Sequence, residues 1–185
     1  MGFGTLFVGY FLLFNIPYFG MTDIIASTVM MLGLSKLQSV NKYFRLAYTI
    51  SMVFAVYSLP ELVFFALDLF KIYSPDGLTA YLRIGQCIIS AVLTFFILRG
   101  IYSVSSEVGL EKVPGRAKFM SYFSIFTYAL WIISSIPKMT ELLGSAVAII
   151  YLSAIVALFL TVALNLTLIY SCHMRICMPD EGKKK

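Results

Sequence analysis

The stretch FNIPYFGMTDIIAS at residues 14–27 decides the fold, because it interrupts an otherwise apolar segment. As one helix, residues 2–34 would extend about 50 Å at 1.5 Å per residue, which is too long for one comfortable membrane crossing. Pro17, Gly20 and Asp23 stand in the middle of that segment and favour a tight turn there. We therefore expect the chain to reverse direction at this point, with Asp23 capping the helix that follows.

The composition indicates the class of protein. Hydrophobic residues make up 60% of the chain and charged residues 12%, and the mean hydropathy is +0.90. A soluble domain carries about twice that share of charged residues. Apolar runs of roughly 18 residues or more can cross a bilayer core, and lipid offers the backbone no hydrogen-bond partners. The sequence thus predicts an all-α integral membrane protein whose principal partner is the lipid bilayer.

A second copy of the turn phrase, SSIPKMTELLGSA at residues 134–146, and a polar turn at residues 71–79 divide the remaining chain. The result is six transmembrane helices arranged as three helical hairpins. The expected helices lie near residues 3–18, 22–38, 45–70, 80–101, 118–136 and 144–173.

Together these helices form one polytopic transmembrane domain, residues 1–178, followed by a polar basic tail at 179–185. In the alternative arrangement, residues 2–34 form a single long bent helix and the domain has five spanning helices.

Charge predicts the orientation. Eleven of the fourteen basic residues fall on the side of the inter-hairpin loops and the C-terminus. They are Lys36, Lys42, Arg45, Arg99, Lys112, Arg116, Lys118, Arg175, Lys183, Lys184 and Lys185. The excess of Lys and Arg marks the cytoplasmic side. We therefore expect both termini to be cytoplasmic and the protein to reside in the plasma membrane. The five-helix alternative would place the N-terminus outside.

The fourth expected helix carries a polar face. Arg83, Gln86, Ser90 and Thr94 are separated by three, four and four residues. At 100° per residue they fall within an arc of about 80°. Polar groups inside a membrane are costly to bury, so such a face is a functional hypothesis.

The third expected helix supplies the acids that could meet this face. We expect a polar cavity between the third and fourth helices that opens to the outside. Glu61 would lie in this cavity and contact a cationic or hydrogen-bonding solute. The candidate ligand-binding residues are Glu61, Gln86, Ser90, Thr94 and Tyr57. In the structural alternative, backbone donors at the Pro60 kink hold Glu61. Counted from Pro75 as the centre of the turn, Glu61 is level with Ser90.

A second acid of the third helix, Asp68, lies at the depth of Arg83 by the same count. Both residues stand near helix ends, where a charged side chain can reach the membrane interface. We interpret Asp68 and Arg83 as a structural ion pair.

The sixth expected helix has a face of small residues suited to helix packing. Ser153, Ala157 and Thr161 recur at a spacing of four and are followed by Asn165. Small residues allow close approach between membrane helices, and Asn165 can form a hydrogen bond across the contact. This face could also meet another membrane protein or a second copy of the chain.

Signatures of catalysis and of cofactor binding are missing from the sequence. His173 is the only histidine, so metal chemistry of the His-Glu-x-x-His kind is excluded. Cys172 and Cys177 beside it fit no zinc-ligand spacing. We expect no catalytic residues, no metal and no cofactor. The net charge of +5 is explained by membrane topology and anionic lipid, so no nucleic-acid partner is required.

These features favour a small solute transporter or a membrane-embedded solute-binding subunit. In size and number of helices the chain is similar to the substrate-binding subunits of energy-coupling-factor vitamin importers. Their Ala-x-x-x-Ala coupling motif is absent from the first expected helix. The alternative is a non-catalytic accessory or assembly subunit of a membrane complex. An intramembrane enzyme ranks third because no paired catalytic residues are found.

Overall fold

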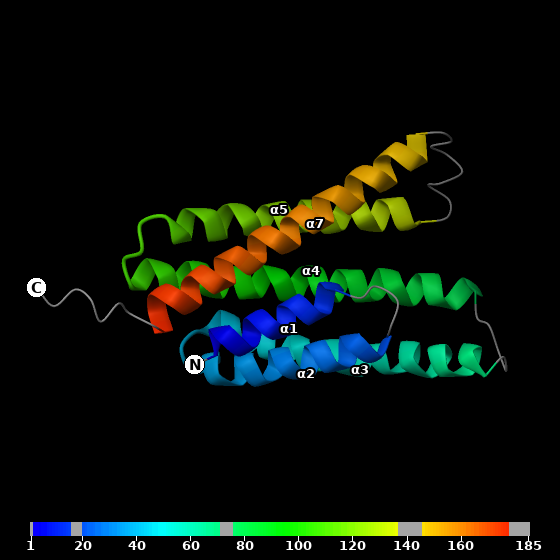
Figure 1. Cartoon of the computed structure of the whole chain (residues 1–185), viewed down its shortest axis with the longest axis horizontal. Coiled ribbons are helices and arrows are strands. Elements are labelled where there is room, and N and C mark those ends of the chain that lie inside the picture. Colours follow the sequence, from blue (N-terminus) through cyan, green and yellow to red (C-terminus); the bar gives the residue numbers. More distant parts are fainter. Residues whose placement is uncertain (1, 16–19, 71–75, 137–145, 178–185) are drawn as a thin grey trace, which may run out of the picture.

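The computed structural model describes residues 2–15, 20–70, 76–136 and 146–177. This part of the chain is all-helical, with six α-helices and no strand (Figure 1). The helices are α1 Phe3–Asn15, α2 Gly20–Leu37, α3 Lys42–Leu69, α4 Asp76–Glu107, α5 Val113–Ser135 and α7 Ala146–Cys172. A π-helical turn, η1 His173–Cys177, continues α7. The all-α fold and the six expected helices are confirmed, with their limits shifted by a few residues.

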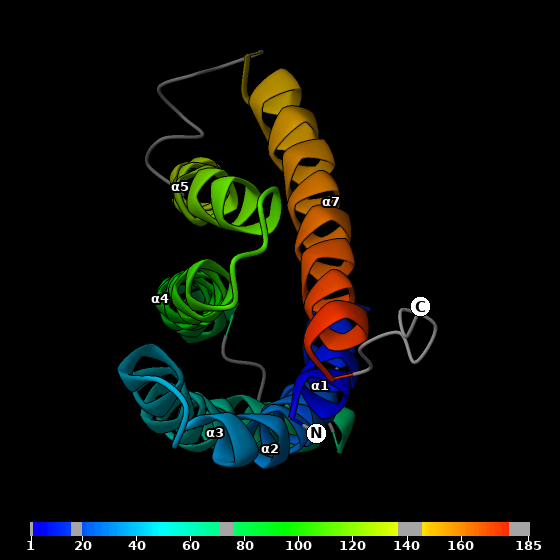
Figure 2. The ribbon, with the colours of Figure 1, turned by 90° about the vertical axis from the view of Figure 1, so that its left-hand side faces the viewer.

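The six helices form a ring in which each helix packs against its neighbours. Every helix contacts the next one along the chain, and α1 contacts α7, so the first and last helices close the ring. Seen from the end, α1 to α3 lie on one side with α4 and α5 stacked above them (Figure 2). Helix α7 runs steeply across α4 and α5 and contacts both.

Helices α1 and α2 are antiparallel and unusually close. A Cβ atom added to Gly9 would lie 2.6 Å from the backbone nitrogen of Met30, and one added to Gly33 would lie 2.6 Å from that of Leu6. The two residue numbers of each pair sum to 39. A constant sum is what two antiparallel helices of one hairpin require. The five-helix alternative, with one long helix over this region, is therefore wrong.

The connection between α4 and α5 is shorter than the sequence predicted. Helix α4 does not end near residue 101 but continues to Glu107, and α5 begins at Val113 rather than near 118. Gly109, at φ +75°, ends α4. The Leu110 amide donates to the Ser105 carbonyl at 3.0 Å, which is the pattern of a Schellman motif.

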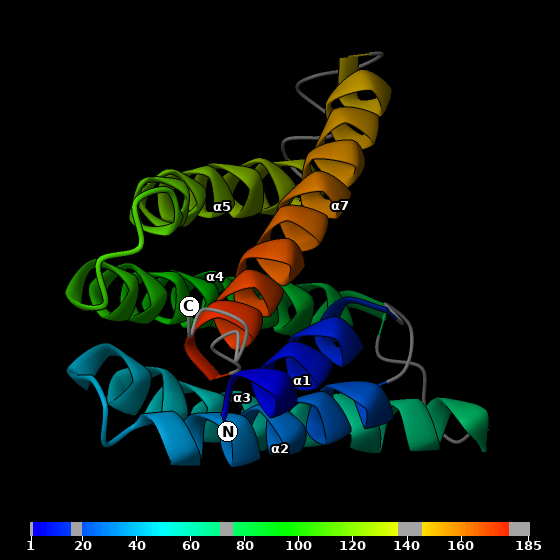
Figure 3. The ribbon, with the colours of Figure 1, turned by 60° about the vertical axis from the view of Figure 1, so that its left-hand side comes forward.

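The apolar core lies at the end of the ring that holds the start of α1 and the end of α7. Its largest buried side chains are Leu6, Tyr10, Met30, Leu34, Phe44, Leu93, Ile97, Leu98, Ile101 and Ile169. We call this the sealed end. At the opposite, open end the packing is looser. Among the described side chains of α3 and α4, none after Ser58 and none before Ser90 is buried. Helix α7 also rises away from α4 toward its own N-terminus (Figure 3).

Three helical segments in the described part of the chain are long and apolar enough to cross a membrane. They are Lys42–Phe64, Tyr81–Glu107 and Ala148–Ile176. A shorter apolar segment, Phe3–Leu13, lies in α1. Length and composition alone make these segments compatible with a membrane protein.

Candidate functional site

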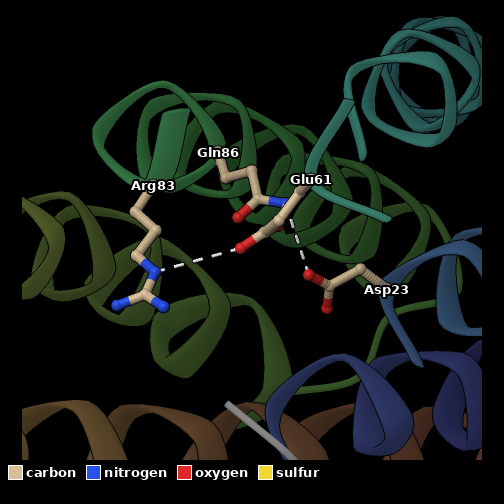
Figure 4. A network of polar contacts seen from close by, with 4 residues as sticks. All are labelled: Asp23, Glu61, Arg83 and Gln86. Atoms are coloured by element: carbon tan, nitrogen blue, oxygen red, sulfur yellow. Dashed lines mark hydrogen bonds and ion pairs between the residues drawn. The ribbon is translucent and has the colours of Figure 1, made fainter. Parts of the chain in front are cut away.

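Four polar side chains from three helices meet near the open end of the ring (Figure 4). Gln86 of α4 stands between two acids and donates through Nε2 to Glu61 Oε2 of α3 and to Asp23 Oδ2 of α2, the latter at 3.4 Å. Arg83 of α4 completes the group, with its Nε 3.9 Å from Glu61 Oε1. We call these four residues the carboxylate cluster.

The local structure explains why these side chains converge. Arg83 and Gln86 are three residues apart on α4 and therefore share one face of the helix. Asp23 lies in the first turn of α2, where the helix dipole favours a negative charge. Glu61 follows Pro60, which stands inside α3 and has no N–H to donate.

The formal charges of the cluster sum to −1. Two carboxylates face one guanidinium, and the Arg83 side chain is 63% exposed whereas that of Glu61 is 20% exposed. Solvent therefore screens the cation more than the acid. The Gln86 amide has two N–H groups and can serve one carboxylate with each. Among the described residues, the contacts found for the two carboxylates are those with Gln86 and Arg83.

The other three predicted ligand-binding residues lie on α3 and α4, the two helices that carry Glu61 and Gln86. Ser90 and Thr94 are buried one and two turns along α4 from Gln86. The Tyr57 hydroxyl lies against the Cα of Gly85, where a Cβ would leave it no room. Helix α4 thus presents a continuous polar face from the open end to the centre of the ring.

The level on α4 that the sequence assigned to Glu61 is wrong by about two helical turns. Tyr57 meets Gly85, and the Phe44 ring meets Gly100, so the α3–α4 hairpin is symmetric about residues 71–72 rather than about Pro75. This shift moves Glu61 from the level of Ser90 to that of Arg83, with Gln86 one turn away on the same face of α4. Turn centres cannot be located within a residue or two from composition alone.

The predicted ion pair between Asp68 and Arg83 falls partly outside the described residues. The structure does not describe the Asp68 side chain. Within the part that it does describe, Arg83 is paired with Glu61. The Asp68–Arg83 pair stays a prediction.

Asp23 is the member of the cluster that sequence reasoning missed. We expected it to cap the second helix, but α2 begins at Gly20, three residues earlier. Its carboxylate consequently lies on the helix side and reaches Gln86 rather than its own backbone. One feature of the sequence could have indicated its role. The predicted turn at residues 14–27 places Asp23 on the same side of the membrane as Glu61.

A second polar group lies at the centre of the ring, and we call it the central network. Asn165 of α7 donates through Nδ2 to the Tyr10 hydroxyl at 2.8 Å and to Ser124 Oγ at 3.2 Å. The Tyr10 and Thr94 hydroxyls share a hydrogen bond of 3.4 Å. Four helices, α1, α4, α5 and α7, are joined through these uncharged groups.

The predicted packing face of the last helix is used over only part of its length. Thr161 is buried and hydrogen-bonds the Thr127 hydroxyl of α5 at 3.0 Å, and Asn165 is fully buried. Ala157 is half-buried. Ser153 is exposed, and its hydroxyl donates to the carbonyl of Ile150 in its own helix. The neighbouring Ala154 is fully buried, and the Tyr151 ring lies 5.4 Å from the Trp131 ring of α5, so this half of α7 packs on α5 through residues other than Ser153.

The described part of the chain contains no group of three His, Cys, Asp or Glu side chains placed to hold a metal ion. Comparison with protein-family models, with curated proteins and with solved structures finds no match to this chain.

Proposed function

We propose that this protein is a multi-pass membrane protein that binds a small organic cation from the outer side, as a transporter or as the solute-binding subunit of one. All six helices cross the plasma membrane, and both termini are cytoplasmic. Helices α2 and α5, of 18 and 23 residues, reach about 27 and 35 Å. They pack beside the three long apolar helices and match a bilayer core of about 30 Å.

The orientation is supported by the distribution of charge. The loop between α2 and α3 and the loop between α4 and α5 both lie at the sealed end, and each is bordered by basic residues. By the positive-inside rule this end is cytoplasmic. The carboxylate cluster then lies in the outer half of the protein.

The observation that carries the proposal is the convergence of Glu61 and Asp23 on the single amide of Gln86. Two carboxylates held this close favour a positively charged ligand, because like charges side by side are mutually destabilising. Arg83 offsets only one of them. A ligand with a single positive charge would neutralise the cluster.

The chemistry of the cluster favours a cation with N–H donors. Ionised carboxylates are acceptors only, and hydrogen bonds from a charged donor to them are roughly twice as strong as neutral ones. A primary ammonium group can donate to both acids at once, whereas a quaternary ammonium group cannot. We therefore assign methylammonium, and not tetramethylammonium, as the better probe.

The packing of the ring supports entry of the solute from the outside. Glu61 and Gln86 are half-buried at the mouth of the open end. Beyond Thr94, the face of α4 that points into the ring carries Ile97 and Ile101, and both side chains are fully buried. We therefore propose that the solute reaches the cluster from the open end.

The proposal is tested by uptake of radiolabelled methylammonium into proteoliposomes. Glu61→Gln should reduce protein-dependent uptake to the level of empty vesicles. Glu107→Gln makes the same chemical change at the sealed end, where Glu107 is exposed, and should leave uptake unchanged. Binding without uptake in the wild type would assign the protein as a binding subunit. Equal uptake by wild type and Glu61→Gln would contradict the proposal.

An accessory or assembly role is the alternative, and the exposed outer face of the N-terminal half of α7 favours it. Ile149 and Phe159 are 73% and 71% exposed there, beside the half-buried Ala157. A partner helix could pack on this surface through the small-residue face. In that case Ala157→Leu should release a protein that co-purifies from native membranes at equal stoichiometry. An unchanged complex would count against this role.

A further inference from the structure

A groove runs between α5 and α7 at the sealed end of the ring. Its volume is about 270 Å³, far more than the roughly 30 Å³ that one water occupies. Helix α5 contributes Arg116, Phe119 and Met120, and α7 contributes Leu164, Thr167 and Ser171. None of these residues belongs to the carboxylate cluster or to the central network, so the groove is a separate feature.

The groove changes from polar to apolar along its length. Arg116 lies in the first turn of α5, and Ser171 lies in the last turn of α7. Phe119 and Leu164 lie one to two turns farther from the sealed end. Its walls therefore place a cation near the helix ends and hydrocarbon toward the middle of the ring.

The polar end of the groove has positive charge without an acid to balance it. The Arg116 side chain is exposed, and among the described residues no carboxylate lies within ion-pair distance of it. The Thr167 and Ser171 hydroxyls donate to carbonyls of their own helix, at 2.8 and 2.7 Å. Arg116 is consequently the charged donor that this end of the groove presents.

The start of α5 adds to the positive potential beside Arg116. Lys112 occupies the N-cap position, and its side chain makes no capping hydrogen bond. The N-terminus of a helix carries a partial positive charge and attracts anions. The neighbouring side chains Lys112 and Lys118 are exposed and carry the same sign of charge.

We propose that this groove binds one anionic phospholipid of the cytoplasmic leaflet. The headgroup phosphate contacts the Arg116 guanidinium, which suits phosphate through paired N–H donors. An acyl chain lies along Phe119 and Leu164. Basic pockets between helices on the cytoplasmic side are suited to anionic headgroups. The assignment depends on the membrane orientation given above but not on the solute that the carboxylate cluster binds.

The test is native mass spectrometry of the purified full-length protein with phosphatidylglycerol or phosphatidylcholine added at equal concentration. The wild type should retain one phosphatidylglycerol in preference to phosphatidylcholine. Arg116→Gln should lower the affinity for phosphatidylglycerol about fivefold, since one basic residue at a membrane surface contributes about that factor. Leu164→Trp fills the apolar part of the groove and should weaken both lipids while leaving every charge in place.

Lys118→Gln is the matched control, because it removes the same charge from an exposed residue two positions along α5 that does not line the groove. Each variant is first shown to retain the wild-type helical content. Equal loss in Lys118→Gln and Arg116→Gln would overturn the proposal, since it would indicate general attraction to basic charge. Equal retention of the two lipids by the wild type would also overturn it, as would a dimer that excludes lipid. Solute uptake is not measured here, so failure of the lipid site and failure of the solute site are distinguishable.

Discussion

The Nδ2 amide of Asn165 donates to the hydroxyl of Tyr10 at 2.8 Å. The two residues stand on the last and first helices, and both are buried. Their hydrogen bond closes the ring at its centre, between the carboxylate cluster and the apolar sealed end. We interpret it as the contact that fixes the tilt of α7 against α1.

This contact predicts an energetic coupling between the two helices. In a double-mutant cycle, Tyr10→Phe and Asn165→Ala should be non-additive by about 0.6 kcal/mol, the average for hydrogen bonds between membrane helices, and by no more than about 1.7 kcal/mol. Reversible unfolding in mixed micelles measures the free energies. Ser153→Ala, on the exposed face of the same helix, should be additive with Tyr10→Phe. Additivity in both cycles would show that Tyr10 and Asn165 are not energetically coupled.

The close contact between α1 and α2 predicts a strong effect of adding one methyl group. Gly9→Ala places its Cβ against the backbone of Met30, which cannot move aside without separating the helices. We expect a loss of about 1–3 kcal/mol in the free energy of unfolding, as for other overpacked cores. Gly115→Ala on α5 meets no atom within 4 Å and should leave stability unchanged or slightly raised. Equal melting temperatures for the two variants would contradict the packing described.

The charge balance of the carboxylate cluster predicts opposite effects of two neutralising substitutions. Glu61→Gln removes an acceptor and a negative charge and should weaken binding of methylammonium. Arg83→Gln removes a cation that competes with methylammonium for Glu61, so this substitution should strengthen methylammonium binding. Because Arg83 is largely exposed, the gain should reach no more than about fivefold, or about 1 kcal/mol. Titration calorimetry on the two variants checks the signs, and weaker binding in Arg83→Gln would indicate that Arg83 contacts the ligand.

The proposed membrane orientation predicts which loops are reached from each side. In a cysteine-free background, Ser39→Cys between α2 and α3 should react with an impermeant maleimide only after the cytoplasmic side is opened. Ser74→Cys, in the loop that the sequence places outside, should react in intact cells. Reaction of both from the same side would show that α3 does not span the membrane.

The sequence was sufficient for the order and number of the helices in the described part of the chain. Pro17 and Gly20 interrupt an apolar segment that is too long for one comfortable crossing, and the basic loops repeat at the spacing of hairpins. The polar face of α4 also followed from periodicity alone, because Gln86, Ser90 and Thr94 recur at helical spacing. These are local signals, and each is contained within one helix or one turn.

Contacts between helices were beyond the reach of the same reasoning. The pairing of Glu61 with Gln86 depends on the register of two helices, which a displaced turn centre shifts by about two turns. Tyr10 meets Asn165 across almost the entire chain, and nothing near either residue in the sequence indicates the other. Asp23 was assigned to the terminus of its own helix for the same reason. Capping is a local sequence pattern, whereas the contact of Asp23 with α4 joins residues far apart in the sequence.

The most direct test of the central claim is equilibrium binding of radiolabelled methylammonium to the purified protein. The wild type should bind one equivalent, and an excess of tetramethylammonium should displace it poorly. Asp23→Asn and Glu61→Gln should each abolish saturable binding while Glu107→Gln retains it. Saturable binding that survives in both Asp23→Asn and Glu61→Gln would contradict the assignment of the carboxylate cluster as the solute site.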